Sequence, residues 1–208
     1  MRERPILFNG DMVRAILAGQ KTQTRRAVAG VRGDNCLSLR KATKTRCGIV
    51  THVLEAPERG LCPFGQRGDR LWVREAHAIF PTHGQHRADA ERWGPWSGLP
   101  TTLSDDGKQI AYYREGFDRC DPGRWRPSIH MPRWACRLLL EITAVRVQRL
   151  QAVSTQDCVA EGITTRFIVE DENDDLRIQF RDLWTSTGGD WDSNPWVWVI
   201  EFKRVVAA

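Results

Sequence analysis

The sequence has no Cys-x-x-Cys pair, no long apolar run and no leader typical of secretion. Its six cysteines are scattered through a chain too large to depend on disulfide bridges, so we expect free thiols in a reducing compartment. No segment approaches the roughly 18 consecutive apolar residues of a membrane span, and the N-terminal Met-Arg-Glu-Arg-Pro lacks an apolar stretch. These absences predict a cytoplasmic protein without a membrane partner.

The sequence also lacks a well-spaced set of metal ligands. One candidate set contains three cysteines at intervals of eleven and fifteen residues, which match no compact zinc-binding loop. The other contains three histidines in a segment typical of a loop, where exposed histidines are the simpler interpretation. We therefore expect no metal and no cofactor. The first set is Cys36, Cys47 and Cys62 with His52, and the second is His77, His83 and His86.

Composition indicates an ordinary globular protein. Hydrophobic residues make up 41% of the 208 residues and charged residues 27%, which suits a chain with one good core. The formal net charge of +5 favours a phosphate-bearing partner, although 26 acidic residues are interspersed among 31 basic ones. The net charge therefore modestly favours nucleic acid or a nucleotide as the partner. No repeat or coiled-coil pattern indicates an oligomeric state.

A short helix is expected before the most polar motif of the chain. Apolar residues recur at helical spacing behind Asp11, a good N-cap, and Gly19 is placed where the chain can turn out of the helix. The motif Ala18-Gly-Gln-Lys-Thr-Gln-Thr-Arg-Arg26 brings a lysine, two hydroxyls and two guanidinium groups to that bend. We expect the chemistry of the protein there. The apolar residues of the helix are Met12, Val13, Ile16 and Leu17.

Alternating patterns predict strands over 70–75, 137–150 and 196–203. The first strand follows a Gly-Asp turn. In the second, the apolar phase changes between Ile142 and Val145, which indicates a β-bulge. The third alternates most strictly, so the core is expected to be mainly β.

Two helices are expected between the last two strands. Ser154-Thr-Gln-Asp157 resembles a capping box with Asp in place of Glu, opening a short helix that Gly162 ends. The second helix follows the acidic segment 171–175, whose charge suits a helix N-terminus. Its apolar face carries Leu176, Phe180, Leu183 and Trp184.

The chain is expected to form one domain over 1–208 with two insertions. The insertion at about 28–67 has no sustained periodicity, which predicts extended loops or an irregular subdomain. In the insertion at about 77–133, prolines interrupt any long helix or central strand, so we expect a loop-rich segment draped over the core. These prolines are Pro95, Pro100, Pro122, Pro127 and Pro132.

Together, several of these motifs resemble the ASCH-domain family. They are the helix ending in Gly-Gln-Lys-Thr-Gln-Thr-Arg-Arg, the Gly-Asp strand entry, the Ser-Thr-Gln-Asp helix with Glu161 and the terminal Val-Ile-Glu-Phe strand. The matching blocks are 1–26, 68–76 and 134–204, and the segments between them look like insertions of long, phage-type members. The resemblance implies an α+β fold: a PUA-like mixed β-barrel with short flanking helices and a loop-rich insertion.

The resemblance also implies an activity, which the fold alone does not fix. A compact bacterial branch of the family hydrolyses the exocyclic amide of N4-acetylcytidine with a lysine, a threonine and a glutamate. Carried over by motif, these are Lys21, Thr24 and Glu161. The implied protein is an amidohydrolase that acts on a small modified nucleoside without a metal.

Amide hydrolysis can use these three groups. Thr24 supplies a hydroxyl nucleophile, which needs a base because a hydroxyl is inert near neutral pH. Lys21 is the candidate base, provided that burial or the neighbouring Arg25 or Arg26 lowers its pKa. A pairing of Glu161 with Lys21 would oppose deprotonation, so we expect Glu161 to shuttle a proton or contact the cytosine ring. Backbone N–H groups or an arginine would stabilise the oxyanion.

The spacing of the motif sets a geometric requirement. In an extended strand Lys21 and Thr24 would point to opposite faces, so we expect a turn-like conformation at Lys21 and Thr22 that brings them together. A substrate-binding cleft is expected to be lined by four further residues, although a surface ladder of alternating charges also explains the last two. They are Arg26, Trp72, Arg74 and Glu75.

Two other functions fit the same sequence. The protein could be a non-catalytic module for RNA or modified DNA, in which basic residues follow phosphates and tryptophans stack on bases. It could also be a ribonuclease that uses Lys21. The basic residues are Arg32, Arg40, Lys41, Lys44, Arg46, Arg124 and Arg126, and the tryptophans are Trp72, Trp125 and Trp134, for which core packing is the alternative.

Overall fold

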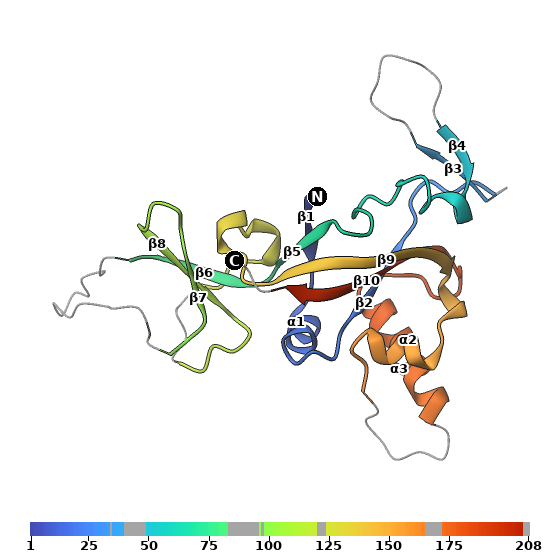
Figure 1. Ribbon diagram of the computed structural model, residues 1–208. Helices are drawn as coiled ribbons and strands as arrows, with labels where there is room; N and C mark the ends of the chain where they lie inside the picture. The colour runs from blue at the N-terminus through green and yellow to red at the C-terminus, as the bar shows by residue number, and fades with distance from the viewer. Residues whose placement is uncertain are drawn as a thin grey trace.

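A five-stranded mixed sheet forms the centre of the molecule (Figure 1). A computed structural model describes residues 1–33, 35–39, 49–82, 96, 98–119, 124–164 and 172–205. The sheet contains β1 (Glu3–Leu7), β2 (Gln23–Ala27), β5 (Arg70–Arg74), β9 (Leu139–Arg149) and β10 (Trp196–Val205). Its order is β1-β5-β9-β10-β2; β1 pairs with β5 in parallel and the other pairs are antiparallel. With its helices this is an α+β fold, as expected.

The sheet is open within the part of the chain that the structure describes. Its two edges are β1 and β2, which share no backbone pairing. Between them lies α1 (Gly10–Leu17), whose Val13 and Ile16 are fully buried. The Arg26 side chain of β2 also reaches across, and its Nη2 donates to the Leu7 carbonyl of β1 at 2.8 Å. The expected barrel is therefore not closed, because a helix and a side chain stand where a backbone ladder would be needed.

The N-terminus of α1 is capped by Asn9, not by Asp11 as expected. The backbone of Asn9 is extended, and its side-chain oxygen accepts a hydrogen bond from the Met12 amide at 2.9 Å. Asp11 instead lies in the first turn and pairs with Arg14. At the other end, Gly19 has a φ of +74°, which confirms the predicted turn out of the helix.

Strands β9 and β10 form the longest pairing of the fold. Their register shifts because Glu201 pairs with Ala144 while the next residue, Phe202, pairs with Ile142. Thr143 is the extra residue, so the predicted bulge is confirmed. β10 is buried on both faces: Trp198, Ile200 and Phe202 pack in the main core, while Val197 and Val199 pack in a second cluster.

Two helices enclose this second cluster. They are α2 (Thr155–Ala160) and α3 (Glu172–Ser186). Ser154 and Asp157 form the predicted capping box at the start of α2, and Gly162 has a φ of +87° just after its end. From α3, Leu176 and Phe180 are buried against the sheet. None of the helices in the described residues is both long and apolar enough to cross a membrane.

The first predicted insertion contains more regular structure than its sequence indicates. β3 (Cys36–Leu39) and β4 (Ile49–His52) pair as an antiparallel two-stranded sheet, followed by a 3₁₀ turn over Val53–Glu55. Val53 and Ala56 are fully buried. Leu37, Ala56 and Cys62 of this segment pack in the main core, so it is part of the central domain. Its short strands show little periodicity in the sequence.

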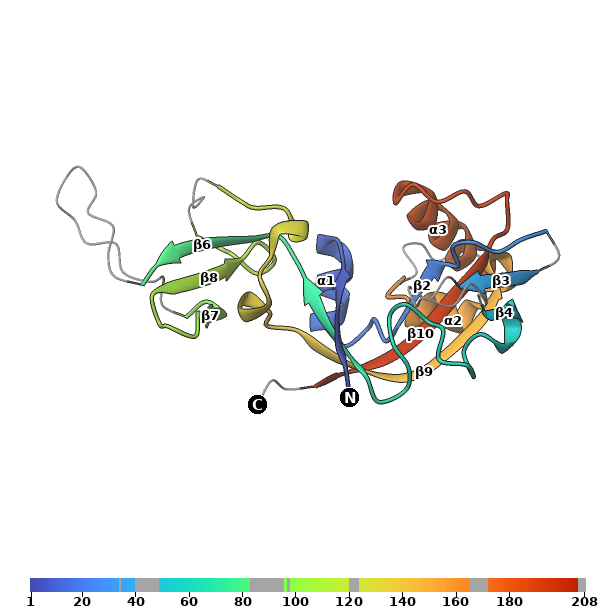
Figure 2. The ribbon, with the colours of Figure 1, turned by 90° about the horizontal axis from the view of Figure 1, so that it is seen from above.

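The second predicted insertion is not draped over the core. It contains an antiparallel sheet of order β6-β8-β7, built from β6 (His77–Pro81), β7 (Thr101–Leu103) and β8 (Gln109–Tyr113). Figures 1 and 2 show this satellite sheet beyond one end of the central sheet. It has its own small core around Tyr113 and Met131. Of the five prolines named above, Pro95 and Pro122 lie outside the described residues. Pro100 directly precedes β7, and Pro127 and Pro132 precede 3₁₀ turns, so these three do not interrupt a strand.

Candidate functional site

The polar motif after α1 joins the end of α2. Lys21 forms an isolated antiparallel bridge with Glu161, and the Thr22 amide donates to the Ala160 carbonyl at 2.8 Å. The turn at Gly19 sends the chain toward α2, and the turn at Gly162 allows a close approach. A Cβ at Gly162 would lie 3.1 Å from the Lys21 Cβ. The local sequence at both turns therefore places Lys21 against Glu161.

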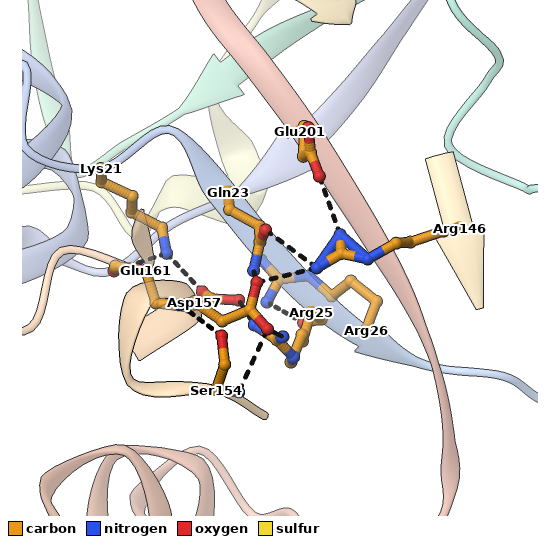
Figure 3. A network of polar contacts seen from close by, with 9 residues as sticks. All are labelled: Lys21, Gln23, Arg25, Arg26, Arg146, Ser154, Asp157, Glu161 and Glu201. Carbon is orange, nitrogen blue, oxygen red and sulfur yellow. Dashed lines mark hydrogen bonds and ion pairs between the residues drawn. The ribbon is translucent and has the colours of Figure 1, made fainter. Parts of the chain in front are cut away.

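Lys21 and Glu161 form a buried ion pair (Figure 3). Lys21 Nζ lies 2.7 Å from Glu161 Oε2 and donates a second hydrogen bond, of 2.8 Å, to the Glu161 carbonyl. The Lys21 side chain is 0% exposed and that of Glu161 is 3% exposed. The amine is thus fixed by two acceptors of one residue.

The environment lowers the pKa of Lys21 below its ordinary value. Burial is the main cause, because it disfavours the ammonium form. The charge and hydrogen bond of Glu161 act in the opposite direction, and the nearby guanidinium groups of Arg26 and Arg25 lower the pKa further. The expectation that burial and these arginines would lower the pKa is confirmed.

Glu161 also binds Arg25. Its Oε1 accepts a hydrogen bond from Arg25 Nη1 at 3.0 Å, while Oε2 faces Lys21. One carboxylate thus neutralises two buried cations, and the local excess of positive charge favours a neutral lysine. Glu161 is therefore a direct partner of the amine, whereas a proton shuttle or a contact with the cytosine ring was expected. Its charge and hydrogen bond raise the pKa of Lys21, so the pairing opposes deprotonation, as expected.

The network continues through Arg25 to a second carboxylate. Arg25 Nη2 lies 2.9 Å from Asp157 Oδ2, and Arg146 Nη2 lies 2.8 Å from Asp157 Oδ1. Arg146 also bonds Glu201 at 2.8 Å, and Gln23 donates to Asp157 at 3.2 Å. Burial alone would raise the pKa of Asp157, but the Ser154 amide, Arg25, Arg146 and Gln23 together lower it to about 2.

The sequence did not predict this part of the network. Asp157 was predicted only as a helix cap, and its second role depends on Arg25 and Arg146 from two other strands. Arg25 is itself fully buried, with Cζ 5.5 Å from the centre of the Phe180 ring. In the sequence, the two adjacent positive charges of the Arg-Arg motif indicate that acidic partners exist, but they do not identify Asp157 as one of them.

Thr24 lies on the other face of β2. Gln23 and Arg25 point toward α2, so alternation along the strand directs Thr24 away from it, opposite Ile200 of β10. Lys21 is bridged to Glu161 in extended pairing, so the expected turn at Lys21 and Thr22 is absent. Thr24 is 1% exposed, and within the described residues no hydrogen bond links it to Lys21 or Glu161.

A cleft of about 550 Å³ is lined mainly by residues of β1, α1, β2 and β5. Lys21, Thr24 and Glu161 do not line it. Two of the expected substrate-binding residues, Arg26 and Arg74, line it. Phe8 also lines it, and Lys21 Nζ is 5.7 Å from the centre of the Phe8 ring. Phe8 and Arg26 therefore separate the buried amine from the cleft; in Figure 3 Arg26 is seen beside the network.

Trp72 and Glu75, the other two expected substrate-binding residues, do not line this cleft. The Trp72 indole contacts two guanidinium groups, with its ring centre 5.4 Å from Arg74 Cζ and 5.8 Å from Arg133 Cζ. Glu75 is buried and accepts two hydrogen bonds from Arg137, of 2.9 and 2.7 Å. Burial raises the pKa of Glu75, and Arg137 partly offsets this effect.

The candidate metal ligands are dispersed. Cys36 and His52 face each other across the pair of β3 and β4, whereas Cys62 is buried in the main core. His77 is not in a loop: it lies on β6, is fully buried, and burial lowers its pKa. No group of three potential ligands occurs among the described residues. Cys47, His83 and His86 lie outside them, as do Arg40, Lys41, Lys44 and Arg46.

Comparison with protein-family models and with curated proteins found no match. Among solved structures, the chain is similar to one described as a high-resolution crystal structure of an ASCH domain from Lactobacillus crispatus JV V101. The similarity covers 99% of this chain and 81% of that one, at 15% sequence identity and a TM-score of 0.36. Membership of the ASCH-domain family stays a prediction from the sequence motifs.

Proposed function

We propose that the protein is an amidohydrolase that removes the acyl group from the exocyclic amine of N4-acylcytidines. The observation that carries the proposal is the buried Lys21 amine, held by Glu161 and depressed in pKa by burial and two arginines. A lysine with a lowered pKa can act as a general base at a lower pH than an ordinary lysine. Structural ion pairs also perturb pKa values, so the contact of Lys21 with Phe8, which lines the cleft, is the second support.

The chemistry uses Thr24 as nucleophile. Lys21 Nζ accepts the Thr24 hydroxyl proton while the oxygen attacks the acyl carbon, giving a tetrahedral oxyanion. Lysine then returns the proton to the exocyclic nitrogen as the C–N bond breaks, releasing cytidine and leaving an acyl ester on Thr24. The same amine then deprotonates a water molecule, whose oxygen attacks the ester carbon. The bond from that carbon to the Thr24 oxygen breaks, the acyl group leaves as a carboxylic acid, and the Lys21 ammonium returns its proton to the Thr24 oxygen.

Glu161 and Arg26 support these steps. Glu161 fixes the position of Lys21 Nζ and stabilises the ammonium form that appears after proton transfer. Arg26 lies on the same face of β2 as Thr24 and lines the cleft, where its charge can stabilise the oxyanion. Thr24 and Lys21 share no hydrogen bond in the described part of the chain, and Thr24 lies on the other face of β2, so the proposal requires this segment to rearrange when substrate binds.

The cleft supports a substrate of nucleoside size. Its volume of about 550 Å³ lies within the usual range of small-molecule sites, and most of its wall is apolar. Phe8 lies between the cleft and Lys21, so in this proposal its ring moves aside when the acyl group enters.

The test is ultraviolet-monitored incubation of the chelator-treated protein with N4-acetylcytidine. Lys21→Met keeps the length of the side chain without its charge, and Thr24→Val keeps the shape of threonine without its hydroxyl. We expect each to reduce kcat/KM by about 10²-fold or more. Lys203→Met is the matched control, because Lys203 also pairs with a glutamate, at 3.3 Å, but on the surface.

The outcomes separate the alternatives. Turnover that survives both site variants, or absence of turnover in folded wild-type protein, would overturn the proposal. Shortening of an RNA substrate, lost in Lys21→Met, would favour the ribonuclease. Salt-dependent binding of oligonucleotides without turnover would favour the binding module.

A further inference from the structure

The cleft carries an unbalanced positive charge. Arg26 and Arg74 line it, and no carboxylate does so among the described residues. Most of the remaining wall is apolar, including Phe8, Met12 and Phe64. Two cations in an apolar wall are costly without a counter-charge, which makes the cleft suited to a ligand with both an apolar ring and an anionic group.

Arg74 has hydrogen-bonding capacity that the protein leaves unused. One of its terminal nitrogens donates to the Ile129 carbonyl, and its guanidinium lies over Trp72. Its Nε is buried without a hydrogen-bond partner, as are the Nε atoms of Arg4, Arg25 and Arg70, and no carboxylate pairs with Arg74 in the described part of the chain. Among these four arginines only Arg74 lines the cleft, so its unpaired charge is available to an anionic group there.

Arg26 is more fully engaged. Its Nη2 donates to the Leu7 carbonyl at 2.8 Å and its Nη1 to the Arg25 carbonyl at 3.3 Å. Its guanidinium also lies over the Phe8 ring, with Cζ 5.4 Å from the ring centre. Two carbonyls of the protein therefore hold the Arg26 guanidinium in place. Arg74 donates to one carbonyl and so has more N–H groups left for a ligand.

We infer that the cleft accepts the phosphate ester of a pyrimidine nucleoside, with the base beside Phe8 and Phe64 and the phosphate on Arg74. This rests on the proposed function and names its substrate class: a free nucleotide in place of the neutral nucleoside. Arginine donors suit a phosphate because the guanidinium can offer two parallel N–H groups. The volume of the cleft suits one nucleotide unit.

The chain provides a matched control for Arg74. Arg133 also lies near the Trp72 ring: its Cζ is 5.8 Å from the ring centre, and the Cζ of Arg74 is 5.4 Å from it. Arg133 is already paired with Glu3 at 2.6 Å and does not line the cleft. Arg74→Gln and Arg133→Gln therefore each remove one positive charge near the same indole, and only the first alters the cleft.

The experiment compares N4-acetylcytidine with its 5′-monophosphate as substrates. We expect the monophosphate to have a KM about ten- to a hundredfold lower in the wild type, as a charge-assisted contact provides. Arg74→Gln should abolish this preference, and Arg133→Gln should retain it. Equal KM values for the two substrates, or a preference that survives Arg74→Gln, would overturn the inference.

Equilibrium binding keeps this test separate from the proposed activity. If neither substrate is hydrolysed, the proposed function fails, but calorimetry with cytidine and cytidine 5′-monophosphate still measures the phosphate contribution. Tighter binding of the monophosphate, lost in Arg74→Gln, would support the site; equal binding would overturn it. The same measurement with a short single-stranded oligonucleotide tests the alternative ligand. Tighter binding of the oligonucleotide than of the monophosphate would show that the cleft binds a nucleic acid, and would overturn the inference of a free nucleotide.

Discussion

Lys21 and Glu161 lie 140 positions apart in the chain, yet Lys21 Nζ contacts both the carboxylate and the carbonyl oxygen of Glu161, at 2.7 and 2.8 Å. The two contacts connect the segment after α1 to the end of α2. Because both side chains are almost completely buried, the pair determines local stability as well as the position of the amine. Changes to one partner are expected to affect folding and activity together.

Replacement of Glu161 by Gln should therefore destabilise the protein strongly. It leaves the buried charges of Lys21 and Arg25 without their shared counter-ion, which costs about 3 to 5 kcal/mol in comparable buried pairs. Urea denaturation measures the loss. The control is Glu141→Gln, which breaks the surface pair with Lys203 and should cost no more than about 1 kcal/mol. Equal losses in the two variants would contradict a special role for the buried pair.

The pH dependence of turnover should reflect the depressed pKa of Lys21. A general base must be neutral, so kcat/KM is expected to rise with pH, with a midpoint below the ordinary lysine value of 10.5. Arg26 is one of the charges that lower this pKa, so Arg26→Gln should shift the rise toward higher pH. A profile that is unchanged in this variant would argue against Lys21 as the titrating base.

The free energy of unfolding should also depend on pH through Lys21, and it should increase as the pH rises. Because the pKa of Lys21 is lower in the folded protein than in the unfolded chain, the unfolded chain binds more protons between these two values. The contribution of Lys21 to the free energy of unfolding therefore increases as pH rises through this window. Lys21→Met should remove that increase, which unfolding curves at several pH values would detect.

Gly162 should be sensitive to substitution because its backbone and its surroundings both exclude a side chain. Its φ is +87°, and a Cβ would lie 2.8 Å from the Ala15 Cβ and 3.1 Å from the Lys21 Cβ. Gly188 is the matched control, since its φ is +84° but nothing lies within 4 Å of its Cβ position. We expect Gly188→Ala to cost about 1 kcal/mol and Gly162→Ala clearly more, with loss of activity as Lys21 shifts. Similar effects in both variants would show that the close approach is unimportant.

The sequence predicted the elements of the site better than their contacts. The turn at Gly19, the capping box at Ser154 and the end of α2 at Gly162 are local features, and the structure has all three. The contact of Arg25 with Asp157 joins residues far apart in the chain, and no local pattern encodes it. The cleft was only partly predictable for the same reason, because it depends on the parallel pairing of β1 with β5, which places Leu7 beside Arg74.

Asp157 should make the protein sensitive to acid. Its pKa is about 2 in the folded protein against an ordinary value of 3.8, so the stabilisation that it provides is present above 3.8 and is lost as pH falls toward 2. Allowing for partial exposure, this amounts to about 1 to 2 kcal/mol. Asp157→Asn should remove it at neutral pH, and the difference from wild type should shrink below pH 3.8. A difference that stays constant down to pH 2 would exclude this carboxylate as the cause.

The pair of Glu75 and Arg137 is predicted to hold the satellite sheet in place and to take no part in substrate binding. Arg137 donates two hydrogen bonds to Glu75 at the end of β5, one to the Glu115 carbonyl, and lies 4.1 Å from the centre of the Tyr113 ring of β8. Removal of one partner leaves a buried charge, so Glu75→Gln and Arg137→Gln should each cost about 3 to 5 kcal/mol. The double variant should cost less than the sum of the two, because it leaves no unpaired charge.

Substrate kinetics distinguish this structural role from the expected binding role of Glu75. Glu75 does not line the cleft, so Glu75→Gln should leave the KM of folded protein unchanged while limited proteolysis between the satellite sheet and the central sheet becomes faster. Glu3→Gln provides the surface control, since Glu3 pairs with Arg133 at an exposed position. A raised KM with unchanged proteolysis would return Glu75 to the substrate site, because a purely structural carboxylate has no means of weakening substrate binding while the fold stays intact.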